Sequence, residues 1–243
     1  MASKQNLSKA AQARVKNYST KSNAVENNTK QRKRDNRLAL IAGLASLGIA
    51  LGSQFLYANM TSTAFPRPTA LPTSTMAENR DWTGSMTVNS TALELTLHGA
   101  LAPQGVSNFV ALANSKFYDG LTCHRVTTAG IYVLQCGDPV GDGTGGPGYS
   151  WGPIENAPKG DIYPAGTIAM ARQSNNASSM GSQFFIVYKD STIPSDSVGG
   201  YSVIGNISSG LAAVELIAGE GTLEGGTDGH PKNPVTLSNV HVK

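Results

Sequence analysis

The chain has 243 residues, which is enough for one sizeable domain with appended segments. Only 14% of the residues are charged and two are cysteines, so the composition excludes a solvated disordered chain and a disulfide-dense scaffold. The net charge of +3 is unevenly distributed: residues 1–37 hold ten basic and two acidic residues, residues 38–58 hold neither, and residues 59–243 hold nine basic and fourteen acidic residues. The acidic balance of the large part argues against nucleic acid as a partner.

The uncharged stretch at residues 38–58 predicts one transmembrane helix, because about 20 apolar residues span the hydrocarbon core at about 1.5 Å per residue. The basic run KQRKRDNR at residues 30–37 places the N-terminal side in the cytoplasm. A cleaved signal peptide is the alternative, but its apolar region usually has about 7–15 residues, so we favour an uncleaved anchor. We therefore expect a single-pass protein of the cell membrane whose large part lies outside the cytoplasm.

The composition divides the chain into four parts. Residues 1–37 are expected to form a basic, mostly disordered cytoplasmic tail, and residues 38–58 the membrane anchor. Residues 59–80 are rich in proline and threonine, which is typical of a semi-rigid linker. The folded domain is expected at residues 81–243.

Short strand-like runs between glycine, proline and asparagine turns fill this domain. The expected strands are residues 85–88, 92–98, 131–135, 166–171, 183–188, 201–205 and 235–242. Helical spacing follows Pro103, over residues 106–113, and recurs at residues 211–217 before Gly219. Because no helices cross between the strands, the pattern predicts an antiparallel sheet or barrel with helical caps.

Motifs for metal, nucleophile or phosphate chemistry do not occur: the four histidines have no metal-ligand spacing, and the run at residues 141–148 lacks the end of a phosphate loop. Arg125, however, lies in a largely apolar stretch. Because a buried, unpaired charge is costly, its side chain is expected either to form an ion pair or to serve the function of the protein. Gln135 follows ten residues later, and Gln183 and Phe185 share one strand face. These residues indicate an apolar groove with oriented donors, suited to binding a neutral group.

The motifs HRV, LQCGDP, GTGGPGY, AMA and GSQFF, in this order and spacing, resemble those of the cyclophilin family of peptidyl-prolyl cis-trans isomerases over residues 84–242. The basic tail and single anchor resemble the membrane-anchored cyclophilins of actinobacteria. The resemblance implies a mainly β fold, a closed eight-stranded antiparallel barrel capped by two helices. It also implies an enzyme that needs no cofactor and binds proline-containing polypeptides, here unfolded exported proteins.

The resemblance implies that Arg125, in the HR motif, is the catalytic residue. It further implies a set of substrate-binding residues that line the peptide groove and the proline pocket: Gln135, Tyr132, Val133, Phe185, Gln183, Ala171 and Tyr201. Alternation along the strand places Phe184 in the core.

This chain departs from the family pattern at several positions. Arg172 stands where the family usually has an asparagine, and Tyr201 where it usually has a histidine. Two extra residues lie between Arg125 and Gln135, and two more between the AMA and GSQFF motifs. The family's rim tryptophan is missing, with Ile193 in that region, so the resemblance implies weak binding of cyclosporin.

Three alternatives stay open at this point. By itself, Arg125 is better explained by a structural ion pair with Asp138 or Glu155, whereas the resemblance favours catalysis. The domain could be a non-catalytic proline-binding chaperone module on a membrane anchor, which the missing tryptophan and Arg172 favour. The chain could also be a membrane scaffold that acts through its tail and helix.

Cys123 and Cys136 lie on strands expected to form a hairpin. An oxidising exterior permits a disulfide. However, alternation along the strands places Cys123 on the same face as Arg125 and Cys136 on the face opposite to Gln135, so the two side chains would point in different directions. A bulge would reverse this parity. We expect two free, buried thiols.

Overall fold

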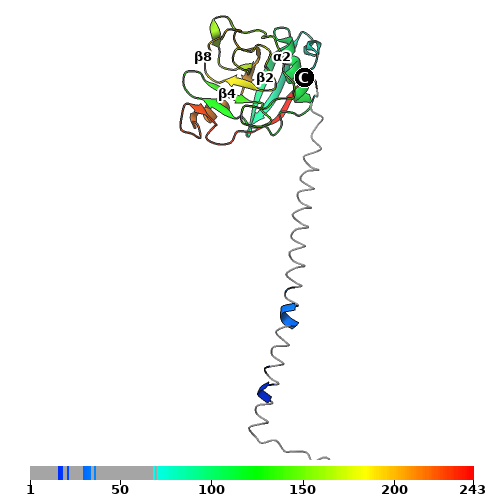
Figure 1. Cartoon of the computed structure of the whole chain (residues 1–243). Coiled ribbons are helices and arrows are strands. Elements are labelled where there is room, and N and C mark those ends of the chain that lie inside the picture. Colours follow the sequence, from blue (N-terminus) through cyan, green and yellow to red (C-terminus); the bar gives the residue numbers. More distant parts are fainter. Residues whose placement is uncertain (1–15, 19–20, 22–29, 34–35, 37–67, 69) are drawn as a thin grey trace, which may run out of the picture. The chain divides into compact units, whose positions relative to one another are not determined.

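The computed structural model describes residues 16–18, 21, 30–33, 36, 68 and 70–243. The chain divides into two compact units, Met1–Thr63 and Ala64–Lys243, and the second contains all the described strands (Figure 1). The described residues of the predicted tail are helical, where the sequence predicted a mostly disordered segment. The predicted anchor at residues 38–58 lies outside the described residues. Within the described residues, no helix is long and apolar enough to cross a membrane.

The second unit is built on a curled antiparallel sheet of nine strands, with a separate two-stranded pair. Along the sheet the order is β10-β3-β4-β7-β6-β9-β2-β1-β11, and β5 pairs with β8. The strands are β1 (Asp81–Val88), β2 (Thr91–His98), β3 (Arg125–Thr127), β4 (Val133–Cys136), β5 (Ile162–Tyr163), β6 (Thr167–Met170), β7 (Phe184–Val187), β8 (Ser191–Thr192), β9 (Val203–Ser209), β10 (Asp228–Gly229) and β11 (Leu237–Val242).

The predicted mainly β, antiparallel fold is confirmed, but the closed eight-stranded barrel is wrong. The sheet has two ends, β10 and β11, which do not pair with each other. The chain before β3 reaches the start of β11 through one bridge, between Thr122 and Thr236, and a few backbone hydrogen bonds, such as the one from Cys123 N to Val235 O. This contact is too short to form a ladder between two strands.

Two α-helices, α2 (Pro103–Asn114) and α3 (Ala212–Gly219), occur in the described part of this unit, as predicted, with two short 3-10 turns, η1 (Ser74–Ala77) and η2 (Lys159–Asp161). Pro103 starts α2, and the carboxylate of Glu155 accepts hydrogen bonds from the N–H groups of Gln104 and Gly105 at 3.0 and 2.9 Å. Glu155 thereby satisfies two of the N–H groups that every helix start leaves without an internal partner.

The core lies between α2 and the inner face of the sheet. The ring of Phe109 on α2 is 5.4 Å from that of Phe184 on β7 and 4.9 Å from that of Tyr118, centroid to centroid. All three side chains are fully buried, which confirms the prediction that Phe184 faces the core.

The folded unit begins before the predicted boundary at residue 81. Ala77 in η1 is fully buried, and its carbonyl accepts a hydrogen bond from the indole N–H of Trp82 at 2.9 Å. Ser107 on α2 donates its hydroxyl to the carbonyl of Ser74 at 3.0 Å. The last part of the predicted linker therefore packs against α2.

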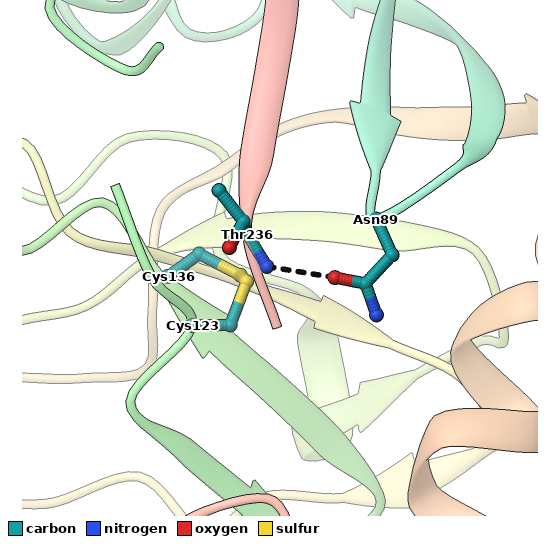
Figure 2. Close-up of a disulfide and its surroundings, with 4 residues drawn as sticks. All are labelled: Asn89, Cys123, Cys136 and Thr236. Carbon is teal, nitrogen blue, oxygen red and sulfur yellow. Dashed lines mark hydrogen bonds between the residues drawn. A yellow bond between two sulfur atoms is a disulfide. The ribbon is translucent and has the colours of Figure 1, made fainter. Parts of the chain in front are cut away.

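Cys123 and Cys136 form a disulfide, with Cα atoms 3.9 Å apart (Figure 2). Cys136 faces the core, as the alternation of β4 predicts, and the prediction of free thiols is wrong because the alternation of β3 does not extend back to Cys123. Residues 123 and 124 precede β3 without being part of it. Cys123 therefore turns into the same core as Cys136, and the two are 2% and 0% exposed. In the same view, the N–H of Thr236 donates to the Asn89 side chain and ties the start of β11 to the β1–β2 turn.

A glycine-rich loop follows β4 and is organised by Asp138. The buried Asp138 carboxylate accepts hydrogen bonds from the backbone N–H groups of Val140 and Asp142 at 2.8 and 3.1 Å, and from Gly143. Burial by itself raises the pKa of Asp138, but these hydrogen bonds outweigh it and lower the pKa below its usual value. The carboxylate thus stays ionised and holds the loop in one shape.

His124 is buried beside this loop, next to Gly143. Neither of its ring nitrogens has a hydrogen-bond partner in the described part of the chain. Burial is the largest influence and lowers the pKa of His124; Arg125 and His230 also lower it, and Asp138 and Asp142 oppose them. The ring is therefore held neutral.

The disulfide gives a first testable prediction. Alkylation of the unfolded, non-reduced protein should add no alkyl groups by mass spectrometry, and alkylation after reduction should add two. Replacing both cysteines by alanine should lower the free energy of unfolding in urea by about 2–4 kcal/mol, because the bridge restricts the unfolded chain. Two alkyl groups without reduction would contradict the disulfide.

The neutral His124 gives a second prediction. The unfolded chain binds a proton at this position near pH 6.5, whereas the folded chain does so only at lower pH, so folding stability should fall as the pH drops below about 6.5. His124→Leu should reduce the loss of thermal stability between about pH 7.5 and 5. Thr192→Ala, at an exposed position on β8 with no titratable group, is the control and should leave that loss unchanged. Equal acid sensitivity in wild type and His124→Leu would show that His124 is not the source.

Candidate functional site

One row of side chains crosses four neighbouring strands on the face of the sheet opposite the main core. Arg125 on β3 pairs with Gln135 on β4, Gln135 pairs with Phe185 on β7, and Phe185 pairs with Ala169 on β6. Because directly opposite residues of paired strands point to the same face of a sheet, these four side chains share one face. Leu134, between Val133 and Gln135, points into the main core instead. We call the face that carries Arg125, Gln135, Phe185 and Ala169 the groove face.

A cavity of about 120 Å³ opens on the groove face. Its lining combines two arginines and an amide with apolar and aromatic side chains: Arg125, Ile131, Val133, Gln135, Ala171, Arg172, Phe185, Ile193 and Tyr201. The Phe185 ring is 5% exposed and packs edge-on against Tyr201, with centroids 5.4 Å apart. We call this cavity the apolar pocket.

Six of the eight predicted site residues line the apolar pocket: Arg125, Gln135, Val133, Ala171, Phe185 and Tyr201. Three lining residues, Ile131, Arg172 and Ile193, were not predicted as site residues. The alternation that joins Val133 to Gln135 also reaches Ile131, so this signal was present in the sequence. From the sequence, Ile193 was noted only as the residue in the region of the family's tryptophan. It was not predicted as a pocket residue, because no local sequence pattern indicates that residues 185 and 193 lie close together.

Tyr132 does not line the apolar pocket, which corrects its predicted position. Two neighbours on an extended chain point to opposite faces, so Tyr132 and Val133 cannot both face the groove. The Tyr132 ring packs instead against Tyr188, with centroids 5.8 Å apart, and the Lys189 ammonium lies 4.7 Å from its centroid.

Gln183 belongs to an adjoining cavity of about 490 Å³, whose wall includes the glycine-rich loop. Its Oε1 accepts a hydrogen bond from Gln135 Nε2 at 2.9 Å. Its own Nε2 donates to the carbonyls of Gly143 and Gly145 at 2.9 and 2.8 Å. Gln183 therefore joins the groove face to the loop, while Gln135, Ala171 and Arg172 border both cavities.

Arg125 pairs with neither of its predicted structural partners, Asp138 and Glu155. Its Nε and Nη2 donate to the two carboxylate oxygens of Asp228 on β10 at 2.7 and 2.8 Å. Its Nη1 donates to Gln135 Oε1 at 3.2 Å. Sequence reasoning missed Asp228, because nothing near residue 228 in the sequence indicates a contact with residue 125.

Arg172, a departure from the family pattern, donates its guanidinium hydrogen bonds to other groups of the protein. Its side chain is 1% exposed, and Nη1 and Nη2 donate to both oxygens of Asp196 at 2.7 and 2.9 Å. Hydrogen bonding from Arg172 is the largest influence on the pKa of Asp196 and holds it well below its usual range. The guanidinium also lies 4.8 Å from the ring centroid of Tyr201. Arg172 thus fixes one wall of the apolar pocket instead of projecting into it.

The chemistry available on the groove face is that of hydrogen bonding. The described residues contain no group of three or more His, Cys, Asp or Glu side chains placed to hold a metal ion. Among the residues that line the apolar pocket, the Arg125 guanidinium, the Gln135 amide and the Tyr201 phenol can donate hydrogen bonds to a neutral ligand. Such a site can bind a small apolar ring. It can also stabilise a state in which a ligand atom next to the ring becomes a stronger hydrogen-bond acceptor.

Comparison with known proteins assigns the fold to a family. The sequence matches the family "Cyclophilin type peptidyl-prolyl cis-trans isomerase/CLD" over residues 84–242, which include all the residues of the apolar pocket. A "Probable peptidyl-prolyl cis-trans isomerase B" of Mycobacterium tuberculosis (strain ATCC 25618 / H37Rv) is 45% identical over 168 residues, which are 64% of this chain and 53% of that protein. The chain thus spans about half the length of this relative.

Two further proteins support the same assignment. A "Peptidyl-prolyl cis-trans isomerase B" of Bacillus subtilis (strain 168) is 42% identical over 122 residues, covering 49% of this chain and 78% of that protein. A crystal structure of a cyclophilin type peptidyl-prolyl cis-trans isomerase of Cryptosporidium parvum, in the presence of the dipeptide Ala-Pro, matches with a TM-score of 0.55 and 25% identity, covering 66% of this chain and 98% of that chain. The chain therefore belongs to the cyclophilin type peptidyl-prolyl cis-trans isomerase family.

Proposed function

We propose that this protein is a peptidyl-prolyl cis-trans isomerase that rotates X-Pro bonds in exported proteins outside the cell membrane. The observation that carries the proposal is the placement of the Arg125 guanidinium at the edge of a pocket lined by Val133, Phe185 and Ile193. A proline ring fits such an apolar cavity, and its ring nitrogen would then lie near a charged donor.

Rotation about an X-Pro bond is slow because the partial double bond of the amide must be lost, at a barrier near 20 kcal/mol. In the twisted transition state the prolyl nitrogen becomes pyramidal and its lone pair can accept a hydrogen bond. An N–H group placed at this nitrogen stabilises the transition state more than either ground state, which is the condition for catalysis.

Arg125 has the donors for this role. Three of its five guanidinium N–H groups donate to Asp228 and Gln135, and the other two have no partner within the described residues. Arg125 is held on the β3–β4 hairpin, while Phe185 and Val133 would hold the proline ring. Gln135 would bind the substrate backbone, so that one side of the bond stays fixed while the other rotates.

A non-catalytic proline-binding module remains the second candidate, because the rim tryptophan of the family is missing. The Arg172 departure lends it less support, since Arg172 is occupied by Asp196 and leaves the pocket open. Weak affinity for cyclosporin remains part of the proposal, because Ile193 lines the pocket in the region where the family carries that tryptophan.

The membrane context is proposed from the sequence. Residues 38–58 form an uncharged stretch preceded by ten basic residues, and this pattern supports a membrane anchor with a cytoplasmic N-terminus. The folded unit would then meet exported polypeptides as they emerge from the membrane. Many of their prolines would still need to isomerise at that stage.

Catalysis by Arg125 is tested by substitution in the full-length chain in detergent, with exchange NMR on a short Ala-Pro peptide as the measure of isomerisation. Arg125→Ala should lower kcat/KM by about 10- to 1000-fold, or about 1.4–4 kcal/mol, because a donor used in the transition state is lost. Lys159→Ala removes an exposed cation in η2 and should leave the rate unchanged. An inactive wild type would favour the binding module, and full activity in folded Arg125→Ala would refute the mechanism.

The proposed topology is tested by protease added outside cells whose walls are permeable. The folded unit should be digested and an N-terminal epitope tag should survive, because the bilayer shields the cytoplasmic tail. A cytoplasmic marker protein must stay intact as the control. Loss of the tag with survival of the folded unit would reverse the topology.

A further inference from the structure

We propose that Asp228 is a positioning residue for catalysis: its carboxylate sets the orientation of the Arg125 guanidinium towards the apolar pocket. The inference rests on the proposed isomerase function and adds a residue that touches no part of the substrate. It starts from the bidentate contact, in which Nε and Nη2 of Arg125 donate to the two oxygens of Asp228. A bidentate pair fixes the plane of a guanidinium as well as its position.

The position of Asp228 follows from backbone pairing and does not depend on its side chain. Asp228 and Gly229 form β10, which pairs with Thr127 and Val126 of β3. Because residues two apart on a strand share a face, Asp228, opposite Thr127, is the diagonal neighbour of Arg125. The backbone thus holds β10 in place, and the carboxylate is free to act on Arg125.

The contact leaves the catalytic donors available. Asp228 occupies Nε and one N–H of Nη2, and Gln135 occupies one N–H of Nη1. Two N–H groups remain, one on each terminal nitrogen, and neither is used by Asp228 or Gln135. In the absence of Asp228, a long arginine side chain that is 36% exposed would sample several rotamers. Asp228 thereby selects the rotamer that presents these two groups.

The orientation extends across the groove through a chain of hydrogen bonds. Arg125 donates to Gln135, Gln135 donates to Gln183, and Gln183 donates to the carbonyls of Gly143 and Gly145. Each amide in this chain has its oxygen and nitrogen assigned by its neighbours. Asp228 supplies the terminal acceptor of the chain, and the charge state of that acceptor is stable, because Arg125 lowers the pKa of Asp228.

The test measures kcat/KM of the full-length chain in detergent by exchange NMR on an Ala-Pro peptide. Asp228→Ala and Asp228→Asn should each lower kcat/KM by about 5- to 50-fold, chiefly through kcat, because a misplaced catalytic group costs rate more than binding. Asparagine should not rescue, since its NH₂ group would face a guanidinium N–H. Asp228→Glu should recover part of the loss. The control Glu94→Gln removes an exposed carboxylate on β2 and should change kcat/KM by less than about twofold.

Two further measurements separate positioning from a structural role. In an Arg125→Ala background, Asp228→Ala should lower kcat/KM no further, because Asp228 acts only through Arg125. In ¹⁵N-edited spectra the Arg125 Nε–H signal, identified by its loss in Arg125→Lys, should exchange slowly with water in wild type and quickly in Asp228→Ala. Unchanged activity in Asp228→Ala, or an equal loss in both backgrounds, would overturn the inference.

The spectroscopic arm also distinguishes failure of the inference from failure of the proposed function. An inactive wild type with a slowly exchanging Arg125 Nε–H signal that Asp228→Ala abolishes would refute the isomerase activity and leave Asp228 as the residue that orients Arg125. An Arg125 Nε–H signal that exchanges equally fast in both proteins would overturn the inference whatever the activity.

Discussion

The antiparallel register that joins β3, β4, β7 and β6 is the constraint on which the site depends. It places Arg125, Gln135, Phe185 and Ala169 in one row, and a slip of one residue would move these side chains into the core. The β3–β4 hairpin is held at both ends, by the disulfide at one end and by the Tyr188 hydroxyl donating to the Thr127 carbonyl at the other. A covalent bond and a buried hydrogen bond therefore restrain the hairpin that carries Arg125.

The polar groups of the groove act as one connected set. From Asp228 through Arg125, Gln135 and Gln183 to the glycine-rich loop, the hydrogen-bond donors and acceptors form a continuous chain. Such a chain keeps a charged donor oriented next to an apolar pocket without enclosing it completely. The arrangement suits a reaction in which a bond rotates and no bond breaks, because orientation is then the main contribution that the protein makes.

The departures from the family pattern become intelligible once the contacts are known. Arg172 introduces a buried charge, and Asp196 and the carbonyls of Gly199 and Gly200 accept its hydrogen bonds. A buried guanidinium is tolerated when its donors are satisfied, and here the paired charges also stiffen the segment before Tyr201. The pocket thus keeps its shape with a different supporting residue.

The sequence by itself determined the antiparallel β class, the two helices and most of the pocket, because alternation of apolar residues, turn residues and ordered motifs are local signals. The prediction from the sequence was wrong at Cys123, because residues 123 and 124 lie outside the strand and do not continue its alternation. It was also wrong at Tyr132, because alternation from Val133 places Ile131 in the pocket instead. Only the tertiary structure decided that Asp228 meets Arg125, which lies 103 residues away in the sequence. The strand β10 has only two residues, so it shows no alternation that a sequence analysis could detect. Its pairing with β3 depends on the packing of the whole sheet.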